Sequence, residues 1–411
     1  MVGADHVAAR ERLTRAVLVV IVAGCLISFL GFGVRSSFGL FLEPMTSARG
    51  WNRETFALAM AIQNLLWGAG VPLAGMFSDR FGPPYVLAGG ALIYAGGVLG
   101  MGLADSSVAL QLTCGVLTGL GIAFTSFSIA LAAMAKVVPA RRRTLALGLG
   151  TAAGSFGQVV FSPVAQGMIS GLGWQDALLF LAIAASVILP IALILPGEDA
   201  AAGRKAMEQT IGQALKEAVG HRGFVLLTVG FFVCGFHVAF IGVHFPAYVR
   251  DLGLAPEVGA YSMAIIGLVN ILGAFSAGLV GQRMSKRTAL SFIYLLRALA
   301  ITGLLLAPKT ELTIYLFSAS MGLLWLSTVP LTSAIVAQVF GVRYMATLFG
   351  IVFFSHQLGS FSGVWLGGYL YDTIGTYDPV WWAGIALGLL AAVIHAPIDE
   401  APVARLAAEP S

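Results

Sequence analysis

Long apolar segments, each of about 20 residues or more, follow one another along nearly the whole of this 411-residue chain. A bilayer core about 30 Å thick is crossed by about 20 helical residues, so each segment is long enough to span a membrane. The apolar runs are continuous rather than alternating, which favours helices over the strands of a transmembrane barrel. The sequence therefore predicts an all-α membrane protein.

Composition supports this class, because 58% of the residues are hydrophobic and only 10% are charged. A soluble protein of this length needs a more polar surface. When the chain is divided at its charged and Pro/Gly breaks, it predicts twelve transmembrane helices. Their expected ranges are 16–43, 54–77, 84–104, 108–136, 144–170, 175–196, 222–249, 257–281, 288–307, 311–340, 344–371 and 378–397.

Lysine and arginine gather on one side of these expected spans, and cytoplasmic loops accumulate both residues. The opposite side holds only Arg49, Arg53, Arg250 and Lys309. We therefore expect a multi-pass protein of the inner (plasma) membrane with both termini in the cytoplasm. No cleavable signal peptide is evident. The formal net charge of +4 is interpreted as a topology signal, and no nucleic-acid partner is expected.

One polar stretch, residues 197–221, divides the expected helices into two sets of six. The predicted organisation is a cytoplasmic tail at 1–15, a six-helix bundle at 16–196, a cytoplasmic linker at 197–221, a second six-helix bundle at 222–397 and a cytoplasmic tail at 398–411.

The two halves also match each other in sequence. The ten residues that begin at Arg53 share Glu, Ala, Met, Ala and Ile in register with the ten that begin at Pro256, 203 residues later. The loop that follows is repeated in weaker form at 278–287. This internal repeat predicts a duplication, in which two related bundles pack around a central site.

At this loop the chain resembles the major facilitator superfamily, and the resemblance covers essentially all of it. The motif consists of Gly75, Asp79, Arg80 and Gly82. The resemblance implies two pseudo-symmetric bundles of six helices and alternating access to a central site. It also implies that Asp79 and Arg80 are gating residues; the alternative is a turn capped by a surface ion pair. The second copy differs, since Gln282 replaces the acid.

Polar residues at membrane depth are the candidates for substrate chemistry, because a charge there is costly unless it lines a cavity or finds a partner. Arg35, His237, His356 and Arg297 fall inside expected spans, whereas no Asp or Glu lies well inside any of them. An anion is bound by a guanidinium or a protonated histidine, so the interior favours an anionic substrate. The ninth helix is usually peripheral in the resembled family, which favours a structural role for Arg297.

Within that family the chain resembles the monocarboxylate and oxalate/formate transporters. The segment 33–43 is similar to the first helix of the monocarboxylate branch, which has an essential basic residue at the position of Arg35. His356 falls where the oxalate/formate branch has a lysine. Both branches use an arginine on the eighth helix, but the corresponding stretch here contains Asn270 instead. One carboxylate is therefore favoured over two.

The resulting hypothesis is a secondary active transporter, expected to be a monomer in lipid, that moves a small monocarboxylate together with a proton. Arg35 binds the carboxylate, and donors that assist it are Asn270 and either Gln158 or Tyr261. A titratable histidine carries the coupled proton, with His356 the first candidate and His237 the second.

The sequence favours other functions less. Efflux of a drug or metabolite by the same fold is the main alternative, and the absence of intramembrane acids disfavours it. A non-transporting membrane sensor would be expected to carry an added soluble domain. The three cysteines lie inside apolar segments without metal-ligand spacing, and the loops contain no catalytic motif. We therefore expect neither an enzyme nor a cofactor or metal site.

Overall fold

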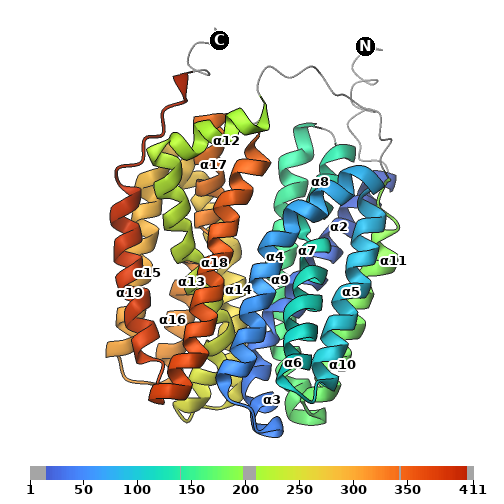
Figure 1. Ribbon diagram of the computed structural model, residues 1–411, viewed down its shortest axis with the longest axis vertical. Coiled ribbons are helices and arrows are strands. Elements are labelled where there is room, and N and C mark those ends of the chain that lie inside the picture. The colour runs from blue at the N-terminus through green and yellow to red at the C-terminus, as the bar shows by residue number, and fades with distance from the viewer. Residues whose placement is uncertain (1–14, 139, 198–209, 342–343, 405–411) are drawn as a thin grey trace, which may run out of the picture.

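The computed structural model describes residues 15–138, 140–197, 210–341 and 344–404. Within these ranges the chain is helical, with no strand, which confirms the predicted all-α class. The helices gather into two bundles that stand side by side (Figure 1). One end of the molecule carries α3 and the other carries α12, and these are called the α3 end and the α12 end below.

The first bundle consists of α2 (Arg15–Ser36), the 3-10 turn η1 (Phe38–Phe41), α3 (Leu42–Arg49), α4 (Arg53–Phe81), α5 (Pro83–Leu103), α6 (Ser107–Leu110), the π-helical η2 (Gln111–Leu117), α7 (Thr118–Phe124), α8 (Phe127–Val137), α9 (Ala140–Leu172), α10 (Trp174–Ser186) and α11 (Ile188–Ala192). After α12 (Ile211–Gly220), the second bundle consists of α13 (Arg222–Asp251), α14 (Pro256–Arg283), α15 (Lys286–Leu306), α16 (Glu311–Leu324), α17 (Thr328–Phe340), α18 (Met345–Ile374) and α19 (Asp378–His395).

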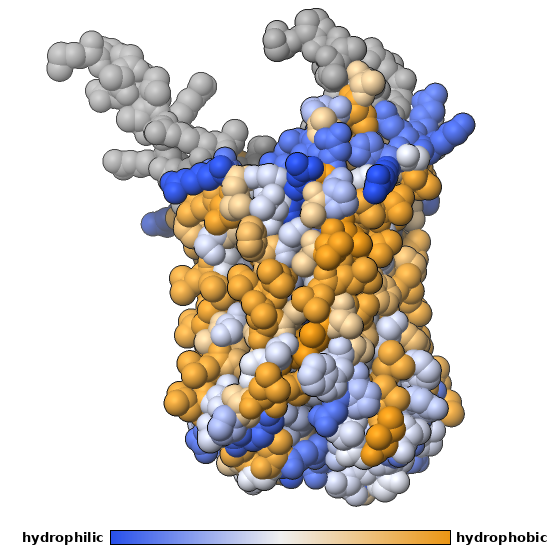
Figure 2. Space-filling view, turned by 90° about the vertical axis from the view of Figure 1, so that its left-hand side faces the viewer, coloured by the Kyte–Doolittle hydropathy of each residue, from blue (hydrophilic) through white to orange (hydrophobic). Residues whose placement is uncertain are grey.

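On the face shown in Figure 2, hydrophobic residues cover the middle of the molecule, and hydrophilic residues gather toward both ends. Large apolar residues in this chain are well exposed, such as Phe275 at 71% and Leu306 at 75%. In water this exposure would be unfavourable, whereas lipid accepts it. The surface is therefore that of a multi-pass membrane protein.

Ten segments of the described chain are long and apolar enough to span a membrane. The long helices α9 (33 residues) and α18 (30 residues) are not among these ten. Twelve spans therefore remain a prediction, in which α9 and α18 supply the other two.

Four of the expected spans are interrupted rather than continuous. The first breaks at Ser37, between α2 and η1; the fourth breaks between α7 and α8; the sixth breaks at Val187, between α10 and α11; and the tenth breaks between α16 and α17. At the first break, the hydroxyls of Ser36 and Ser37 donate to the Gly33 carbonyl oxygen at 2.8 and 3.2 Å. Hydroxyls that bond to nearby backbone carbonyls compete with helical bonding, so the predicted continuous helix over 16–43 ends early. Arg35 consequently occupies the last turn of α2.

Close helix contacts join the two bundles along several seams. Helix α4 of the first bundle packs on α18 of the second, and α9 packs on α14. Glycine allows close approach between the bundles at Gly68, where α4 meets α18, and at Gly39, where η1 meets α13. A Cβ at Gly68 would lie 2.6 Å from Gln357 Cγ, and one at Gly39 would lie 2.3 Å from the Gly242 carbonyl oxygen. Small residues thus let helices of opposite bundles approach closely.

Candidate functional site between the two bundles

Arg35 is held by side chains of the neighbouring helix α4. Its Nη2 donates to Asn64 Oδ1 at 2.8 Å, and its guanidinium lies over the Trp67 ring, 4.4 Å from the centroid. Asn64 Nδ2 donates to the Met60 carbonyl oxygen, which turns the amide oxygen toward Arg35. Arg35 Nε is buried and has no hydrogen-bond partner in the part of the chain that the structure describes. The guanidinium is therefore oriented but only partly satisfied.

No carboxylate of the described residues pairs with Arg35. The ion pairs found in this part of the chain join Arg53 to Asp251, Arg250 to Glu43 and Lys286 to Glu400. A guanidinium presents donors in a fork that matches a carboxylate. Arg35 is thus available to an external anion.

An aromatic bridge connects Arg35 to the second bundle. The Trp67 ring meets Phe353 of α18 edge-on, with centroids 5.5 Å apart and planes at 78°. Phe353 stacks on His356, with centroids 5.6 Å apart and planes at 11°. The structure therefore brings Arg35 and His356 to one interface between the bundles, on either side of this aromatic pair.

Gln357 adds a third polar group to this interface. Its Oε1 lies 3.0 Å from His356 Nδ1, while its Nε2 is buried without a partner. Trp67 Nε1 is also buried and unpartnered. Three N–H groups, from Arg35, Trp67 and Gln357, thus lack acceptors at one interface. A buried donor without an acceptor is unfavourable, so this interface suits a ligand rich in acceptor atoms.

The sequence prediction missed Asn64, the indole N–H of Trp67 and the amide of Gln357. Asn64 and Gln357 are polar residues inside apolar spans, which is the same signal that identified Arg35 and His356. Their amides are a weaker signal in the sequence, because an uncharged polar group in lipid costs less free energy than a charge.

Asn270 and Gln158 lie at a different seam, between α9 and α14. Asn270 Nδ2 donates to Ser155 Oγ at 3.0 Å, and its Oδ1 accepts from the Leu326 N–H at 3.0 Å. Gln158 Nε2 donates to the Met263 carbonyl oxygen at 2.8 Å. The donors that were expected to reach a substrate are therefore engaged with protein atoms, and neither residue contacts the Arg35 interface in this conformation.

The remaining predicted contacts lie elsewhere. Tyr261 is 50% exposed on α14, which packs on α16 of the same bundle. His237 is buried inside the second bundle, where its Nε2 contacts the Gly384 carbonyl oxygen of α19 at 2.8 Å. The structure does not bring either residue to Arg35. Their roles in substrate binding and proton transfer stay predictions without a supporting contact.

Arg297 has a clear structural environment. It is fully buried, and its Nε and Nη2 both donate to the Leu324 carbonyl oxygen, while Nη2 also donates to that of Trp325 at 2.6 Å. These carbonyls lie where α16 ends at the break of the tenth span. Backbone groups freed in lipid must be satisfied within the protein. Arg297 therefore stabilises the interrupted helix, in line with the structural interpretation, and its Nη1 is buried without a partner among the described residues.

The predicted gating motif lies at the end of α4. The side chain of Asp79 is outside the described residues. Arg80 is exposed, with its guanidinium 5.2 Å from the Phe81 ring centroid. Gly82 ends the helix at φ +88°, a conformation that glycine adopts readily, and a Cβ at Gly75 would meet no atom within 4 Å. The gating role remains a prediction.

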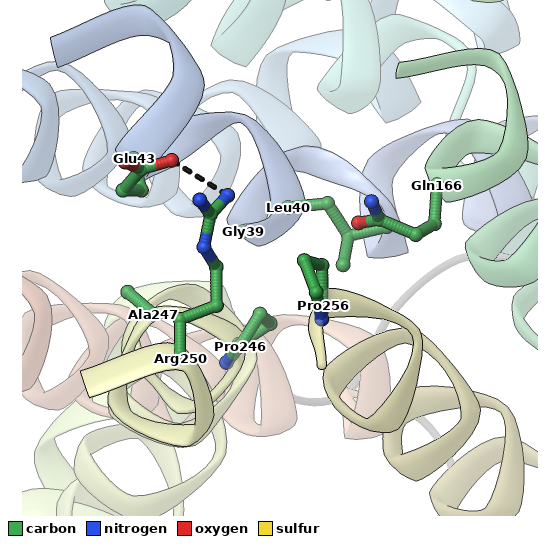
Figure 3. A pocket seen from close by; sticks show the side chains of 8 residues that line it. All are labelled: Gly39, Leu40, Glu43, Gln166, Pro246, Ala247, Arg250 and Pro256. Atoms are coloured by element: carbon green, nitrogen blue, oxygen red, sulfur yellow. Dashed lines mark ion pairs between the residues drawn. The ribbon is translucent and has the colours of Figure 1, made fainter. Parts of the chain in front are cut away.

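Polar contacts tie the bundles together at the α3 end. Arg53 of α4 forms two 2.6 Å bonds with the carboxylate of Asp251. Arg250 pairs with Glu43 of α3 at 2.6 Å, beside Pro246 and Ala247 of the second bundle (Figure 3). Within the described residues, both ion pairs that cross between the bundles lie at this end (Figure 1).

A helix terminus adds to this closure. Asp372 of α18 accepts from the backbone N–H groups of Arg53 and Glu54, at 3.1 and 2.6 Å, so the second bundle caps the N-terminus of α4. Arg53 Nη1 also donates to the Tyr377 hydroxyl at 2.8 Å. Burial raises the pKa of Tyr377, which keeps the hydroxyl protonated. The bundles are thus closed against each other at the α3 end.

Replacing Asp251 by alanine is expected to open the α3 end, because Arg53 loses its partner in the other bundle. An ion pair of this exposure contributes about 1 kcal/mol, or roughly a fivefold change in the closed population. Spin labels at the exposed positions Ala48 and Ala255, in a background without native cysteines, would report longer distances. Lys286→Ala, which breaks an ion pair inside the second bundle, is the matched control. An unchanged distance distribution in Asp251→Ala would contradict the assignment.

Comparison with known proteins identifies a family and relatives with similar sequences. The model of the Major Facilitator Superfamily matches residues 24–364. The chain is 26% identical to the uncharacterized MFS-type transporter YcxA of Bacillus subtilis, over 82% of this chain and 84% of that protein. It is 28% identical to monocarboxylate transporter 13 of Bos taurus, over 85% of this chain and 82% of that protein.

Solved structures share the fold at lower identity. A bacterial homolog of the human lysosomal transporter Spinster, in an inward-facing and unoccupied conformation, matches with a TM-score of 0.76 at 16% identity, covering 93% of this chain and 97% of that one. A D-xylose-proton symporter matches with a TM-score of 0.73 at 16% identity, with the same coverage of both chains. At such identities the likeness concerns the fold alone.

Proposed function

The chain belongs to the Major Facilitator Superfamily, and on this basis we propose that it is a secondary active transporter of a small organic anion, namely a monocarboxylate. The observation that carries the proposal is Arg35, a guanidinium between the bundles with no carboxylate partner among the described residues. A charge in this position is unfavourable unless it serves a ligand or a partner. An anion that enters between the bundles supplies that partner.

The surroundings of Arg35 support a carboxylate in particular. A carboxylate has two oxygens and about four lone-pair sites and donates nothing when ionised. The unpartnered N–H groups of Arg35, Trp67 and Gln357 are all donors. The Trp67 and Phe353 rings provide an apolar surface for the rest of the substrate. Curated relatives that carry the name monocarboxylate transporter agree with this substrate class.

A dicarboxylate fits this interface less well. Its second charge would need another cationic group, and Arg297 is occupied with the carbonyls of Leu324 and Trp325 inside the second bundle. Arg53 and Arg250 pair with carboxylates at the α3 end. Arg35 is therefore the guanidinium we assign to a single negative charge.

Proton coupling is proposed through His356. This histidine is 7% exposed and lies beside the aromatic bridge, on the opposite side from Arg35.

The basic residues of the sequence favour both termini in the cytoplasm, so the closed α3 end faces outward in the proposal. A site open alternately to each side then carries anion and proton together. The proposed membrane is the inner (plasma) membrane, with the monomer as the transporting unit.

Uptake into vesicles tests the proposal. In vesicles containing the purified protein, a labelled monocarboxylate such as propanoate or 2-oxopropanoate is expected to accumulate faster as the external pH falls. An uncoupler that removes the pH gradient is expected to abolish the accumulation. Uptake that ignores both pH and uncoupler would contradict proton coupling alone. Accumulation of dicarboxylates or of cations in place of monocarboxylates would contradict the substrate class.

A further inference from the structure

The side chain of Gln357 crosses from the second bundle to the first. It is fully buried near the middle of α18, and its Cγ lies where a side chain at Gly68 of α4 would be. Gly68 follows Trp67 and lies one helical turn beyond Asn64, on the face of α4 that holds Arg35. Gln357 therefore reaches the surroundings of the proposed anion site.

The oxygen of the Gln357 amide is already engaged. It lies 3.0 Å from His356 Nδ1 and accepts from Ser360 Oγ at 3.2 Å. An amide oxygen can only accept, so this arrangement fits a ring whose Nδ1 carries a hydrogen. The histidine thus determines which end of the amide is turned toward it.

The nitrogen of the same amide is the group left over. Gln357 Nε2 is buried and has no acceptor among the described residues. An amide without a constraint would rotate to satisfy its nitrogen, because an unsatisfied buried donor is unfavourable. Here the bond from His356 prevents that rotation. The two free N–H bonds then remain for an acceptor outside the protein.

We propose that Gln357 is a substrate-contacting donor whose orientation is set by His356, and that the neutral ring carries its hydrogen on Nε2, so that a proton added at Nδ1 couples proton binding to anion binding. The inference rests on the proposed function of the Arg35 site and names a further residue in it. When Nδ1 carries a hydrogen, the amide presents N–H groups to the anion. When Nδ1 has none, it becomes an acceptor, and the amide turns to donate to it. The amide oxygen then faces the anion and repels it.

The charges around His356 also favour binding of the proton and the anion together. The groups that face it from the packed elements are the thiol of Cys234 on α13, Arg297 of α15 through that thiol, and Arg35 beyond the aromatic bridge. A proton added to His356 therefore places a positive charge between two guanidiniums. An anion at Arg35 relieves this repulsion, and by linkage the proton strengthens anion binding.

Binding measurements on the purified full-length protein test the proposal, with propanoate and 2-oxopropanoate as probes over about pH 5 to 8. Gln357→Leu removes the donor and is expected to weaken affinity by about tenfold to a hundredfold. Gln357→Glu places a negative charge there and is expected to abolish binding. Gln357→Met, which has a similar volume, replaces Gln357→Leu if that variant does not fold.

Gln63→Leu is the matched control. Gln63 is a buried glutamine of α4 whose Nε2 donates to the Cys114 carbonyl oxygen inside the first bundle, at 3.0 Å. Its replacement is expected to leave anion affinity unchanged. If Gln357→Leu and Gln357→Met bind the probes as the wild type does, the proposal is wrong.

His356 variants separate the positioning role from simple packing. His356→Asn keeps an N–H donor near the position of Nδ1 but cannot titrate, so affinity is expected to persist while its pH dependence disappears. His356→Leu is expected to weaken binding at every pH. A wild-type pH profile in His356→Asn would overturn the coupling. If Arg35→Gln also binds the anion probes with wild-type affinity, the proposed function fails as well. If the Gln357 variants bind with wild-type affinity but Arg35→Gln does not, this inference fails alone.

Discussion

Replacing Arg35 by glutamine is expected to abolish monocarboxylate binding and transport while the protein still inserts and folds. Glutamine can donate a hydrogen bond, but it lacks the charge and the planar fork that match a carboxylate. Removing one partner of a buried, hydrogen-bonded charge pair costs about 2–5 kcal/mol, which is a loss of at least thirtyfold in affinity. Ligand-dependent thermal shift and vesicle uptake, measured on the same preparation, would show this loss.

Two other arginine variants make this result specific. Arg35→Lys keeps the charge but loses the fork, and it interacts less favourably with the Trp67 ring; we expect intermediate affinity. Arg49 is the matched control, since its guanidinium lies 5.6 Å from the Trp174 ring centroid, at the α3 end of the same bundle. Arg49→Gln should bind normally. Wild-type affinity in Arg35→Gln would remove the basis for an anionic substrate.

Replacing Arg297 by leucine is expected to destabilise the fold strongly. The variant leaves the Leu324 and Trp325 carbonyl oxygens without their donor at the break of the tenth span. Each buried polar group left unsatisfied costs about 1–3 kcal/mol, so a total loss near 3 kcal/mol is expected. The midpoint of thermal unfolding in detergent should fall accordingly. Arg297→Lys can reach one of these carbonyls and should be less harmful.

Arg287 provides the comparison for this second result. Its Nη1 also donates to a carbonyl oxygen, that of Ile398 at 2.8 Å, but the residue is only partly buried. Water can replace Arg287, so Arg287→Leu should change the unfolding midpoint little. If Arg297→Leu unfolded at the normal temperature but lost anion binding, Arg297 would belong to the binding site rather than to the helix break.

Most of the fold followed from patterns that a single helix carries. Continuous apolar runs predicted an all-α membrane protein, and the motif at Gly75–Gly82 pointed to the superfamily that the family model confirms. Helix breaks were harder to foresee. The first span looked continuous through Ser37, and the interruption there depends on hydroxyls that bond to the Gly33 carbonyl oxygen. A hydropathy pattern contains no information on such hydrogen bonds between side chains and the backbone.

The candidate site was predicted in part. Arg35 and His356 do lie at one interface, joined through Trp67 and Phe353. Asn270 sits at another seam, where Ser155 and the Leu326 N–H already satisfy its amide. Both kinds of residue look alike in the sequence, as polar side chains in apolar spans. The rotation of each helix about its axis and the choice of its neighbour separate them.

The sequence by itself determined that lipid surrounds this protein, that the protein is helical and which family it belongs to. It also showed basic groups at membrane depth without acidic residues in the same spans. These properties depend on composition and on local order, and they can be assessed one helix at a time. The tertiary structure alone decided that Arg297 donates to the carbonyls of a broken helix inside one bundle while Arg35 lies at the contact between the bundles, and that Gln357 meets His356 and α4. Hydrogen-bond satisfaction is a property of pairs, and the partners here come from helices far apart in the chain.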